Sequence, residues 1–473
     1  MIGIVVSNAD HASTHIGEKL LEVRSWTEHE DTDTPDDRGG GTYYTTPGFE
    51  LRTFEELHIY LGDPTPAFAA PEALECIIFV SRHAGNTGKL LTAHVTGNFG
   101  AAEYGGTDGG LTRAAPNTQK AIVDAFDRFA PEDYDLGIEC THHGPSELSV
   151  PSLFAEVGSD EPQWRDPDAA EAVARAVLAV GRTPADRFDD TATPRHVVGF
   201  GGGHYAPRFT RIVTDTDWAV GHIGADWQLE AMGPVEENPE VIERAFEQSN
   251  AEHAIVEGTK PALTATIEDL GYHVVSETWV RTVGDRSLEL VSELESELSP
   301  IDNGLRFGDV SVESADAVDI WPLPAELVAA ASGVDLNATY QAVKTNAVAF
   351  ETTEGATKPT DRVAIPTKDS EDTPNEHYDA IVDELMGVLE PKYDSIERGG
   401  EDSEDGDDGE TVIARTTGFD PSLAETLGIP EGPAFGKLAA GQSVEVDGRT
   451  IDPTAVTTEQ VDRFPIPSTT ENC

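Results

Sequence analysis

Two kinds of hydrophobic pattern alternate along the first 300 residues of the chain. Short apolar runs, such as CIIFVS at 76–81, are typical of buried strands. Between them, apolar residues recur every three or four positions, as at 169–180, where Asp166 and Pro167 provide a helix start and Gly181 a helix stop. Strands that alternate with helices in this way predict an α/β domain with a largely parallel sheet.

The same patterns place the individual elements. Strands are expected at 2–6, 57–61, 76–81, 136–141, 152–157 and 195–200, and helices at 15–23, after the N-cap Asn117, at 169–180 and after 238. Beyond residue 305, helices are expected at 325–331 and 378–389, and the Asp-Gly pair in SVEVDGRTI (443–451) predicts a hairpin.

The chain divides into four predicted segments. Residues 1–305 are expected to form the main domain, a three-layer αβα arrangement around a mixed, largely parallel sheet. Residues 306–396 are predicted as a helical and irregular extension, 397–410 (ERGGEDSEDGDDGE) as a disordered acidic linker, and 411–473 as a small β-rich module. The last three segments together make a smaller α+β extension of the main domain.

The charge is strongly acidic throughout. The 473 residues include 88 Asp and Glu against 31 Lys and Arg, of which nine are Lys, and the formal net charge is −57. The carboxylates are spread along the chain rather than gathered in one tail. A densely charged surface keeps a protein soluble when salt screens repulsion, so we interpret the acidity as adaptation to a halophile's cytosol and not as the mark of a basic partner.

Cysteine usage and the first residues favour a cytoplasmic protein. Cys76, Cys140 and Cys473 form no C-x-x-C pair, which fits a reducing compartment without disulfides. MIGIVVSNAD begins directly as a strand, without the basic region of a signal peptide, and no apolar run approaches the length of a membrane span, about 18 residues. We expect a cytoplasmic monomer that does not enter a membrane.

Histidines gather where the predicted strands end. Thirteen of the 14 lie in the first 273 residues. Active sites of open α/β sheets lie beyond the carboxyl ends of the strands. The stretches that combine histidine or glutamate with such an end are SRHAGNTGKLLTAH (81–94), ECTHHGPSELSVPS (139–152), FAEVGS (154–159) and GFGGGHYAP (199–207). Most other histidines, among them His58 and His253, are expected to be structural.

Strand alternation predicts which of these side chains meet. The strand expected at 136–141 places Glu139 and Thr141 on one face. If the strand continues to residue 143, His143 lies on the same face and His142 on the opposite one. Phe154 and Glu156 likewise share a face. A buried carboxylate needs a partner, and imidazole can provide one. The side chains expected to converge are those of Glu139, His143, Glu156 and His204, joined by His83 and His94.

The glycine run in GFGGGHYAPRFT is not a nucleotide-binding motif. A P-loop requires Lys-Ser/Thr after the glycines, and the dinucleotide fingerprint requires a third glycine where His204 stands. Pro207 would interrupt a helix that begins at Gly203, unless it fills the first turn. The run therefore predicts a backbone that approaches a ligand closely, with an imidazole at the strand end.

Two chemistries stay open for these side chains. Imidazole and carboxylate bind Zn²⁺, which lowers the pKa of water to about 7. Alternatively, a metal-free acid–base pair works with glycine N–H groups that stabilise an oxyanion. No HExxH or C-x-x-C motif decides between the two. The catalytic candidates are His143, His204, Glu156 and Glu139, and the candidate metal ligands are His83, His94, His142, His143 and His204.

Three motifs carry a family resemblance. SRHAGNTGKLLTAHVTGNFG, CTHHGPSELSVPSLFAEVGSDEPQW and GFGGGHYAPRFT, in this order, resemble the archaeal and plant type of D-aminoacyl-tRNA deacylase, here in a haloarchaeal form with a C-terminal extension. The resemblance covers about residues 1–305. It implies hydrolysis of the ester between a D-amino acid and the tRNA 3′ end, a Zn²⁺ cofactor, and a fold similar to those of peptidyl-tRNA hydrolases and nucleoside phosphorylases. Substrate binding is expected of Gly201, Gly202, Gly203, Tyr205, Asn98, Ser159 and Arg208.

Two alternatives to this activity stay open, and the charge constrains all of them. One is a peptidyl-tRNA hydrolase or another metal-assisted hydrolase; the other is a non-catalytic tRNA-binding module with structural histidines.

At molar salt the screening length is about 3 Å, so tRNA recognition is expected to depend on shape, stacking and short contacts. The cations near the motifs that could meet phosphates are Arg82, Lys89, Arg113, Arg208 and Arg211.

Overall fold

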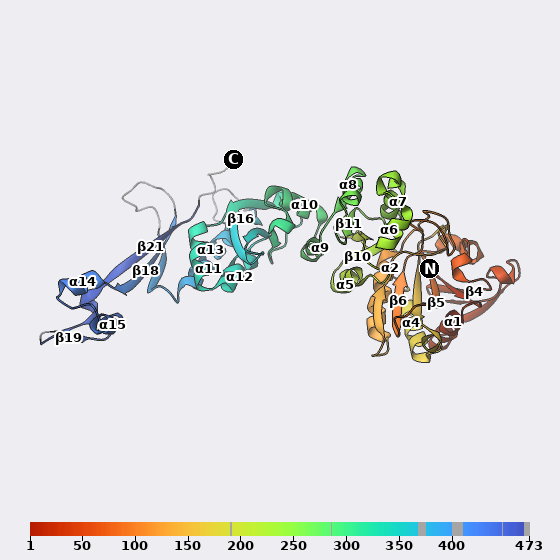
Figure 1. Cartoon of the computed structure of the whole chain (residues 1–473), viewed down its shortest axis with the longest axis horizontal. Helices are drawn as coiled ribbons and strands as arrows, with labels where there is room; N and C mark the ends of the chain where they lie inside the picture. Colours follow the sequence, from red (N-terminus) through yellow and green to blue (C-terminus); the bar gives the residue numbers. More distant parts are fainter. Residues whose placement is uncertain (190–191, 285, 368–374, 400–409, 447, 468–473) are drawn as a thin grey trace. The chain divides into compact units, whose positions relative to one another are not determined.

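The computed structural model describes residues 1–189, 192–284, 286–367, 375–399, 410–446 and 448–467. They belong to two compact units, Met1–Arg286 and Ser287–Cys473 (Figure 1). Among these residues, no helix has the length and apolar character needed to cross a membrane.

An eight-stranded mixed sheet forms the centre of the first unit. Its order is β2-β3-β4-β1-β5-β8-β6-β7. The central strands β4, β1, β5 and β8 are parallel, whereas β6 runs antiparallel to β8. The bounds are β1 Ile2–Ser7, β2 Thr27–Asp31, β3 Gly41–Thr46, β4 Phe49–Phe54, β5 Cys76–Arg82, β6 Leu90–His94, β7 Asp135–Ile138 and β8 Ser152–Gly158.

Helices cover one face of this sheet. Helix α1 (His11–Val23) packs against α4 (Pro167–Ala179) and β5, and α4 packs against β8 and α2 (Pro116–Phe129). The predicted start of α4 is confirmed, because Asp166 caps it and Pro167 is its first residue. Short α3 (Glu161–Trp164) follows β8. The opposite face, which carries Phe79 and Phe154, is free of these helices and packs against Phe68 and Leu74 from the segment before β5.

A smaller parallel sheet, ordered β10-β9-β11-β12, completes the first unit. Helix α2 contacts both sheets, through β6 and β10. The core of this part includes Val198, Phe200, Ile242 and Phe246. The bounds are β9 His196–Phe200, β10 Ala219–Gly224, β11 His253–Val256, β12 His273–Val274, α5 Pro207–Asp215, α6 Asp226–Met232, α7 Pro239–Ser249, α8 Pro261–Asp269 and α9 Glu277–Val283.

The second unit has its own core, in which Phe350, Leu385 and Val412 are fully buried. It contains the sheets β13-β15-β16-β14 and β17-β18-β21, and a hairpin of β19 with β20 where Asp-Gly predicted one. The bounds are β13 Arg306–Phe307, β14 Val318–Pro322, β15 Ala349–Thr353, β16 Lys358–Pro366, β17 Ser395–Gly399, β18 Thr411–Phe419, β19 Val444–Val446, β20 Arg449–Ile451, β21 Thr457–Pro465, α10 Leu288–Glu297, α11 Ala325–Val334, α12 Leu336–Asn346, α13 Glu376–Leu389, α14 Pro421–Thr426 and α15 Pro433–Ala439.

The α/β class is confirmed, and two local predictions are wrong. Residues 57–61 are not a strand: they contain a 3₁₀ turn, His58–Tyr60, because His58 rather than its apolar neighbours is buried. Asn117 does not cap α2, which begins one residue earlier with Pro116, while the Asn117 side chain bonds to Pro184 O. The segment boundaries after 305, 396 and 410 stay predictions, and residues 400–409 of the predicted linker lie outside the described residues.

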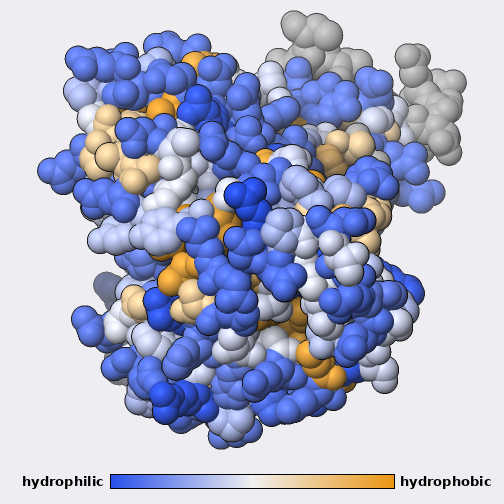
Figure 2. Space-filling view, turned by 90° about the vertical axis from the view of Figure 1, so that its right-hand side faces the viewer, coloured by the Kyte–Doolittle hydropathy of each residue, from blue (hydrophilic) through white to orange (hydrophobic). Residues whose placement is uncertain are grey.

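The surface agrees with the acidic composition. Figure 2 shows one face of the molecule, on which hydrophilic residues predominate and hydrophobic ones occupy small areas.

Buried neutral histidines make the stability of the first unit depend on pH. His222 on β10 is fully buried between the Thr141 hydroxyl and Thr112 O, and burial lowers its pKa to about 4. The unfolded chain binds a proton near pH 6.5, so stability is complete above that pH and is lost as the pH falls toward 4.

We expect His222→Gln to flatten this dependence. Between pH 7 and pH 4 at constant high KCl, the variant should lose about 3 kcal/mol less free energy of unfolding than the wild type. Denaturant unfolding at each pH measures this difference. His11→Gln is the control, because His11 is exposed on α1; equal pH dependence in wild type and His222→Gln would contradict the prediction.

Candidate active site

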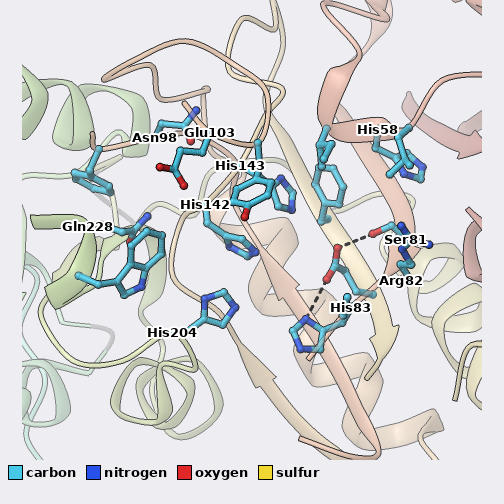
Figure 3. A pocket seen from close by; sticks show the side chains of 18 of the residues that line it. His58, Ser81, Arg82, His83, Asn98, Glu103, His142, His143, His204 and Gln228 are labelled. Atoms are coloured by element: carbon cyan, nitrogen blue, oxygen red, sulfur yellow. Dashed lines mark hydrogen bonds and ion pairs between the residues drawn. The ribbon is translucent and has the colours of Figure 1, made fainter. Parts of the chain in front are cut away.

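A cavity of about 640 Å³ opens on the face of the large sheet opposite α1 and α4, and residues of α6 form part of its wall. In Figure 3, His142 and His143 lie at its centre, with Asn98 and Gln228 to one side and His58 and Ser81 to the other. His58, expected to be structural, lies in the cavity wall, where Ser13 Oγ is 3.2 Å from its Nε2.

Strand register assembles one wall of the cavity. Ser81 of β5 is opposite Glu156 of β8, and His94 of β6 is opposite Phe154. Residues two apart share a face, so the predicted pairing of Phe154 with Glu156 on one face is confirmed. Because β6 is antiparallel to β8, the residue that ends it, His94, reaches the middle of β8. The sequence predicted a cluster beyond the carboxyl ends of the strands. In the structure, part of the cluster also lies on the face of the sheet.

The glycine run brings His204 to Glu139. After β9, the chain turns through Gly201 and Gly202, both with positive φ, and pairs with the segment that follows β7: Cys140 N donates to His204 O over 2.9 Å. The His204 Nε2 consequently lies 2.7 Å from Glu139 Oε2. Pro207 then occupies the first turn of α5 instead of interrupting a helix.

The predicted orientations of His142 and His143 are wrong. It is His142, and not His143, that lies near Glu139, with its Nε2 3.7 Å from Glu139 Oε2. The ring of His143 instead packs edge-on against Phe154, with centroids 5.0 Å apart. Strand β7 already ends at Ile138 and His143 has a φ of 45°, so strand alternation does not extend to these residues.

Two buried carboxylates organise the electrostatics. Glu139 and Glu156 are 2% and 3% exposed, and His83 Nδ1 lies 3.1 Å from Glu139 Oε1 and 3.6 Å from Glu156 Oε2. Burial opposes a charge on His83, but these two carboxylates outweigh it and raise its pKa to about 11. Burial likewise opposes the carboxylate charges, yet hydrogen bonds with the histidines hold the pKa of both glutamates well below the ordinary value. The cluster is a set of ionised carboxylates around a cationic His83.

Three histidines have the hydrogen bonds expected of metal ligands. The Nδ1 atoms of His94, His142 and His143 lie 3.1, 2.8 and 2.7 Å from the carbonyl oxygens of Val95, Cys140 and Gly144. A carbonyl oxygen only accepts, so each Nδ1 carries the proton and each Nε2 offers a lone pair.

These histidines also meet in space. One ring nitrogen from each lies within 4.8 Å of the others. His94 Nε2 is buried and makes no hydrogen bond within the described residues. Burial lowers the pKa of His142 well below its usual value and that of His143 to about 4, which keeps both neutral. Burial also opposes charge on His94, but Glu156 raises its pKa, so a proton and a metal compete for this nitrogen. The donor set fits Zn²⁺.

The other groupings fit a metal less well. Cys140, His142 and His204 also lie within reach of one ion, but burial raises the pKa of the Cys140 thiol and keeps it protonated. His83 groups with Glu139 and Glu156, where it serves as their cation. Of the five predicted ligands, His83 lies between the two carboxylates, and His204 bonds to Glu139 while it also groups with His142 and Cys140.

Of the residues predicted to bind substrate, Asn98 lines the cavity. Gly201 and Gly202 pack against Glu257, and Gly203 has open space around it. The others make the following contacts: Tyr205 OH lies 2.9 Å from His83 Nε2, Ser159 Oγ donates to Gly88 O, and Arg208 Nε pairs with Glu277. Their roles in binding stay predictions.

Sequence reasoning missed much of the cavity wall, including Tyr104, Trp227 and Gln228. These three lie outside the histidine motifs, on a loop and on α6. What distinguishes Tyr104 and Trp227 from other aromatic residues is the exposure of their rings, which the sequence does not give.

Comparison with known proteins identifies the family. A family model described as D-aminoacyl-tRNA deacylase matches residues 70–275. A protein of Halorubrum lacusprofundi named D-aminoacyl-tRNA deacylase is 55% identical to this chain, over 100% of this chain and 98% of its own length. A protein of the same name from Haloarcula marismortui is 48% identical, over 98% of this chain and 100% of its own length. The chain belongs to the D-aminoacyl-tRNA deacylase family.

Membership of the deacylase family makes the chain a hydrolase that acts on an ester bond. The family resemblance drawn from the histidine motifs is thereby confirmed. A crystal structure titled as a conserved protein of unknown function, AF0625, is also similar: it is 31% identical with a TM-score of 0.53, over 61% of this chain and 99% of that one.

The turn that positions His204 in this member of the deacylase family can be tested by its effect on stability. Gly201 has a φ of +97°, and a Cβ there would lie 2.6 Å from Glu257 O, whereas a Cβ on Gly203 would meet nothing within 4 Å. Gly201→Ala should lower the free energy of unfolding by about 2 kcal/mol or more, and Gly203→Ala should change it by less than about 0.5 kcal/mol. Denaturant unfolding in high KCl measures both; similar losses would contradict this account of the turn.

Proposed function

We propose that the chain hydrolyses the ester between a D-amino acid and the 3′ end of tRNA, with Zn²⁺ held by His94, His142 and His143. The observation that carries the proposal is the shared bonding pattern of these histidines, whose Nδ1 atoms all bond to backbone carbonyls and of which one ring nitrogen each lies within 4.8 Å of the others. Zn²⁺ in such a site would act as a Lewis acid and lower the pKa of water.

His204 is the proposed proton carrier. Its side chain is 32% exposed, whereas that of Glu139, which accepts from its Nε2, is fully buried. An imidazole that loses and gains protons at the cavity surface is stabilised as a cation by such a carboxylate. His204 can thus accept the proton of the attacking water and return it to the ribose oxygen that leaves.

Glu156 and His83 are proposed to hold this arrangement in place. The Ser81 hydroxyl donates to Glu156 Oε1 over 2.6 Å and His83 lies beside the other oxygen of this carboxylate, as the dashed lines in Figure 3 mark. His83 also lies 3.1 Å from Glu139 Oε1 and so bridges both carboxylates. Losing His83 would leave two buried negative charges without a cation, and the carboxyls would then take up protons.

The finer features predicted from the sequence belong to the same proposal. We propose that the cavity rejects the L amino acid by steric clash at the α-carbon rather than by weaker attraction to its side chain. A cytoplasmic, monomeric, salt-adapted protein with a three-layer αβα main domain is consistent with the acidic chain and with haloarchaeal relatives.

We expect deacylation to be stereoselective and to depend on metal. At high KCl, the protein should release tyrosine from D-Tyr-tRNA at least about 100-fold faster than from L-Tyr-tRNA, and a chelator should abolish the release until Zn²⁺ is restored. Equal cleavage of both esters would refute chiral selection. Cleavage of N-acetylated but not free D-Tyr-tRNA would favour a peptidyl-tRNA hydrolase, and binding without any cleavage would favour a tRNA-binding module.

Two histidine variants separate the proposed roles. His142→Ala should lose both bound zinc and activity, because it removes a ligand. His204→Ala should keep zinc while the rate falls by about 10²- to 10⁴-fold, because it removes the proton carrier. Metal analysis and single-turnover deacylation measure the two effects, with His11→Ala as the control on exposed surface. Zinc loss in His204→Ala, or full zinc in His142→Ala, would contradict the assignment.

A further inference from the structure

Exposed aromatic rings gather around the cavity. Among the described residues, five aromatic side chains are more than one-third exposed. Tyr104 and Trp227 line the cavity, and Tyr60 and Tyr205 directly follow the lining residues Ile59 and His204. The fifth, Phe188, precedes β9 and neither lines the cavity nor adjoins a lining residue. We call the four the aromatic rim: Tyr60 (54% exposed), Tyr104 (63%), Tyr205 (37%) and Trp227 (50%). Exposed rings gathered at one cavity mouth favour a binding surface, since single exposed apolar residues are otherwise scattered.

The backbone of the rim is bonded to the turn that carries the histidines. Gly144 N donates to Tyr104 O over 3.0 Å, directly after His143. Beside Trp227, the Gln228 side chain donates to Thr141 O, directly before His142. The rings of Tyr104 and Trp227 are thus exposed while their backbones are fixed relative to the reactive cluster.

The rim residues also lie on neighbouring segments. The loop that carries Tyr104 packs on α6, because a Cβ on Gly100 would lie 2.9 Å from the backbone of Ala231. The same loop packs on Tyr60, whose ring is 3.4 Å from the Cβ position of Gly105. Tyr104 and Trp227 both line the cavity. Tyr60, Tyr104 and Trp227 therefore lie on segments that pack against one another, and Tyr205 is placed by its hydroxyl, 2.9 Å from Nε2 of His83 in the cavity wall.

Few cations near the site are free to bind phosphate. Of the five predicted to do so, four are in ion pairs: Lys89 with Asp133, Arg113 with Asp186 at 2.6 Å, and Arg208 and Arg211 with Glu277 at 3.2 and 3.7 Å. Arg82 lines the cavity. A chain of net charge −57 that binds a polyanion needs attraction of another kind.

We propose that the aromatic rim is a stacking platform for the unpaired nucleotides at the 3′ end of tRNA, with Tyr104 and Trp227 as its main rings. This rests on the proposed function, since an ester that reaches His142 is attached to a ribose whose base must lie at the cavity mouth. Every base has a π-face, and stacking on aromatic side chains requires no net attraction between charges. It therefore persists at salt concentrations that screen phosphate contacts.

Binding of the ribonucleotide ACCA tests the rim without catalysis. In high KCl, Trp227→Ala and Tyr104→Ala should each weaken binding by about 5- to 150-fold, the range for loss of one stacked base. Trp227→Phe should retain most of the affinity, and Phe188→Ala, which removes an equally exposed ring away from the cavity, should match the wild type. Fluorescence anisotropy of labelled ACCA measures each dissociation constant. Wild-type affinity in both rim variants would overturn the proposal.

Salt dependence separates stacking from phosphate contacts. The dissociation constant of ACCA should change little as KCl rises, and an oligonucleotide with abasic sites should bind as weakly to the wild type as ACCA binds to Trp227→Ala. A steep loss of affinity with salt, or equal binding of the abasic oligonucleotide, would show that phosphates and not bases are recognised.

Kinetics then connect the rim to the reaction. With D-Tyr-tRNA, Trp227→Ala should raise KM by a factor in the same range, whereas Phe188→Ala should leave both KM and kcat at the wild-type values. ACCA binding through the rim without deacylation would refute the proposed function and support the rim. Deacylation with unchanged KM in the rim variants would do the reverse.

Discussion

The structure around the cavity depends on the burial of two carboxylates, Glu156 on strand β8 and Glu139 directly after strand β7. An ionised carboxylate taken out of water costs several kcal/mol unless it is paired and hydrogen-bonded. Three histidines from two separate stretches meet this requirement: His83 bridges both groups, His204 bonds to Glu139, and His94 lies 3.6 Å from Glu156. The need to compensate two charges thus brings together the groups that can bind metal and move protons.

The same burial divides the histidines by charge. Two carboxylates hold His83 as a cation, whereas burial holds His142 and His143, whose Nδ1 atoms bond to carbonyls, neutral. A neutral imidazole can donate a lone pair to a metal and a cationic one cannot. One cluster therefore provides both a ligand set and its counter-charges, and the mean surface charge of the chain contributes nothing to this division because the groups are shielded from solvent.

For a salt-adapted protein, as proposed here, an aromatic cavity mouth would bind a nucleic acid better than a basic one. Carboxylates spread over the surface favour solubility in salt, but they also pair with the few arginines and lysines near the site, such as Arg113 and Arg208. In molar salt, long-range attraction to a polyanion is screened in any case. Contact of flat apolar faces is not weakened by screening, so rings such as Trp227 can supply the affinity that charges supply at low salt.

The sequence by itself determined the local features: the start of α4 at Asp166, the shared face of Phe154 and Glu156, the class of the fold, and the motifs that identify the family. Each depends on residues close together in the chain. Only the tertiary structure decided that β6 runs antiparallel and carries His94 to the middle of β8, that His142 and not His143 faces Glu139, and that rings from a loop and from α6 share one mouth. These outcomes follow from strand pairing and chain reversal between distant segments, which local periodicity does not encode.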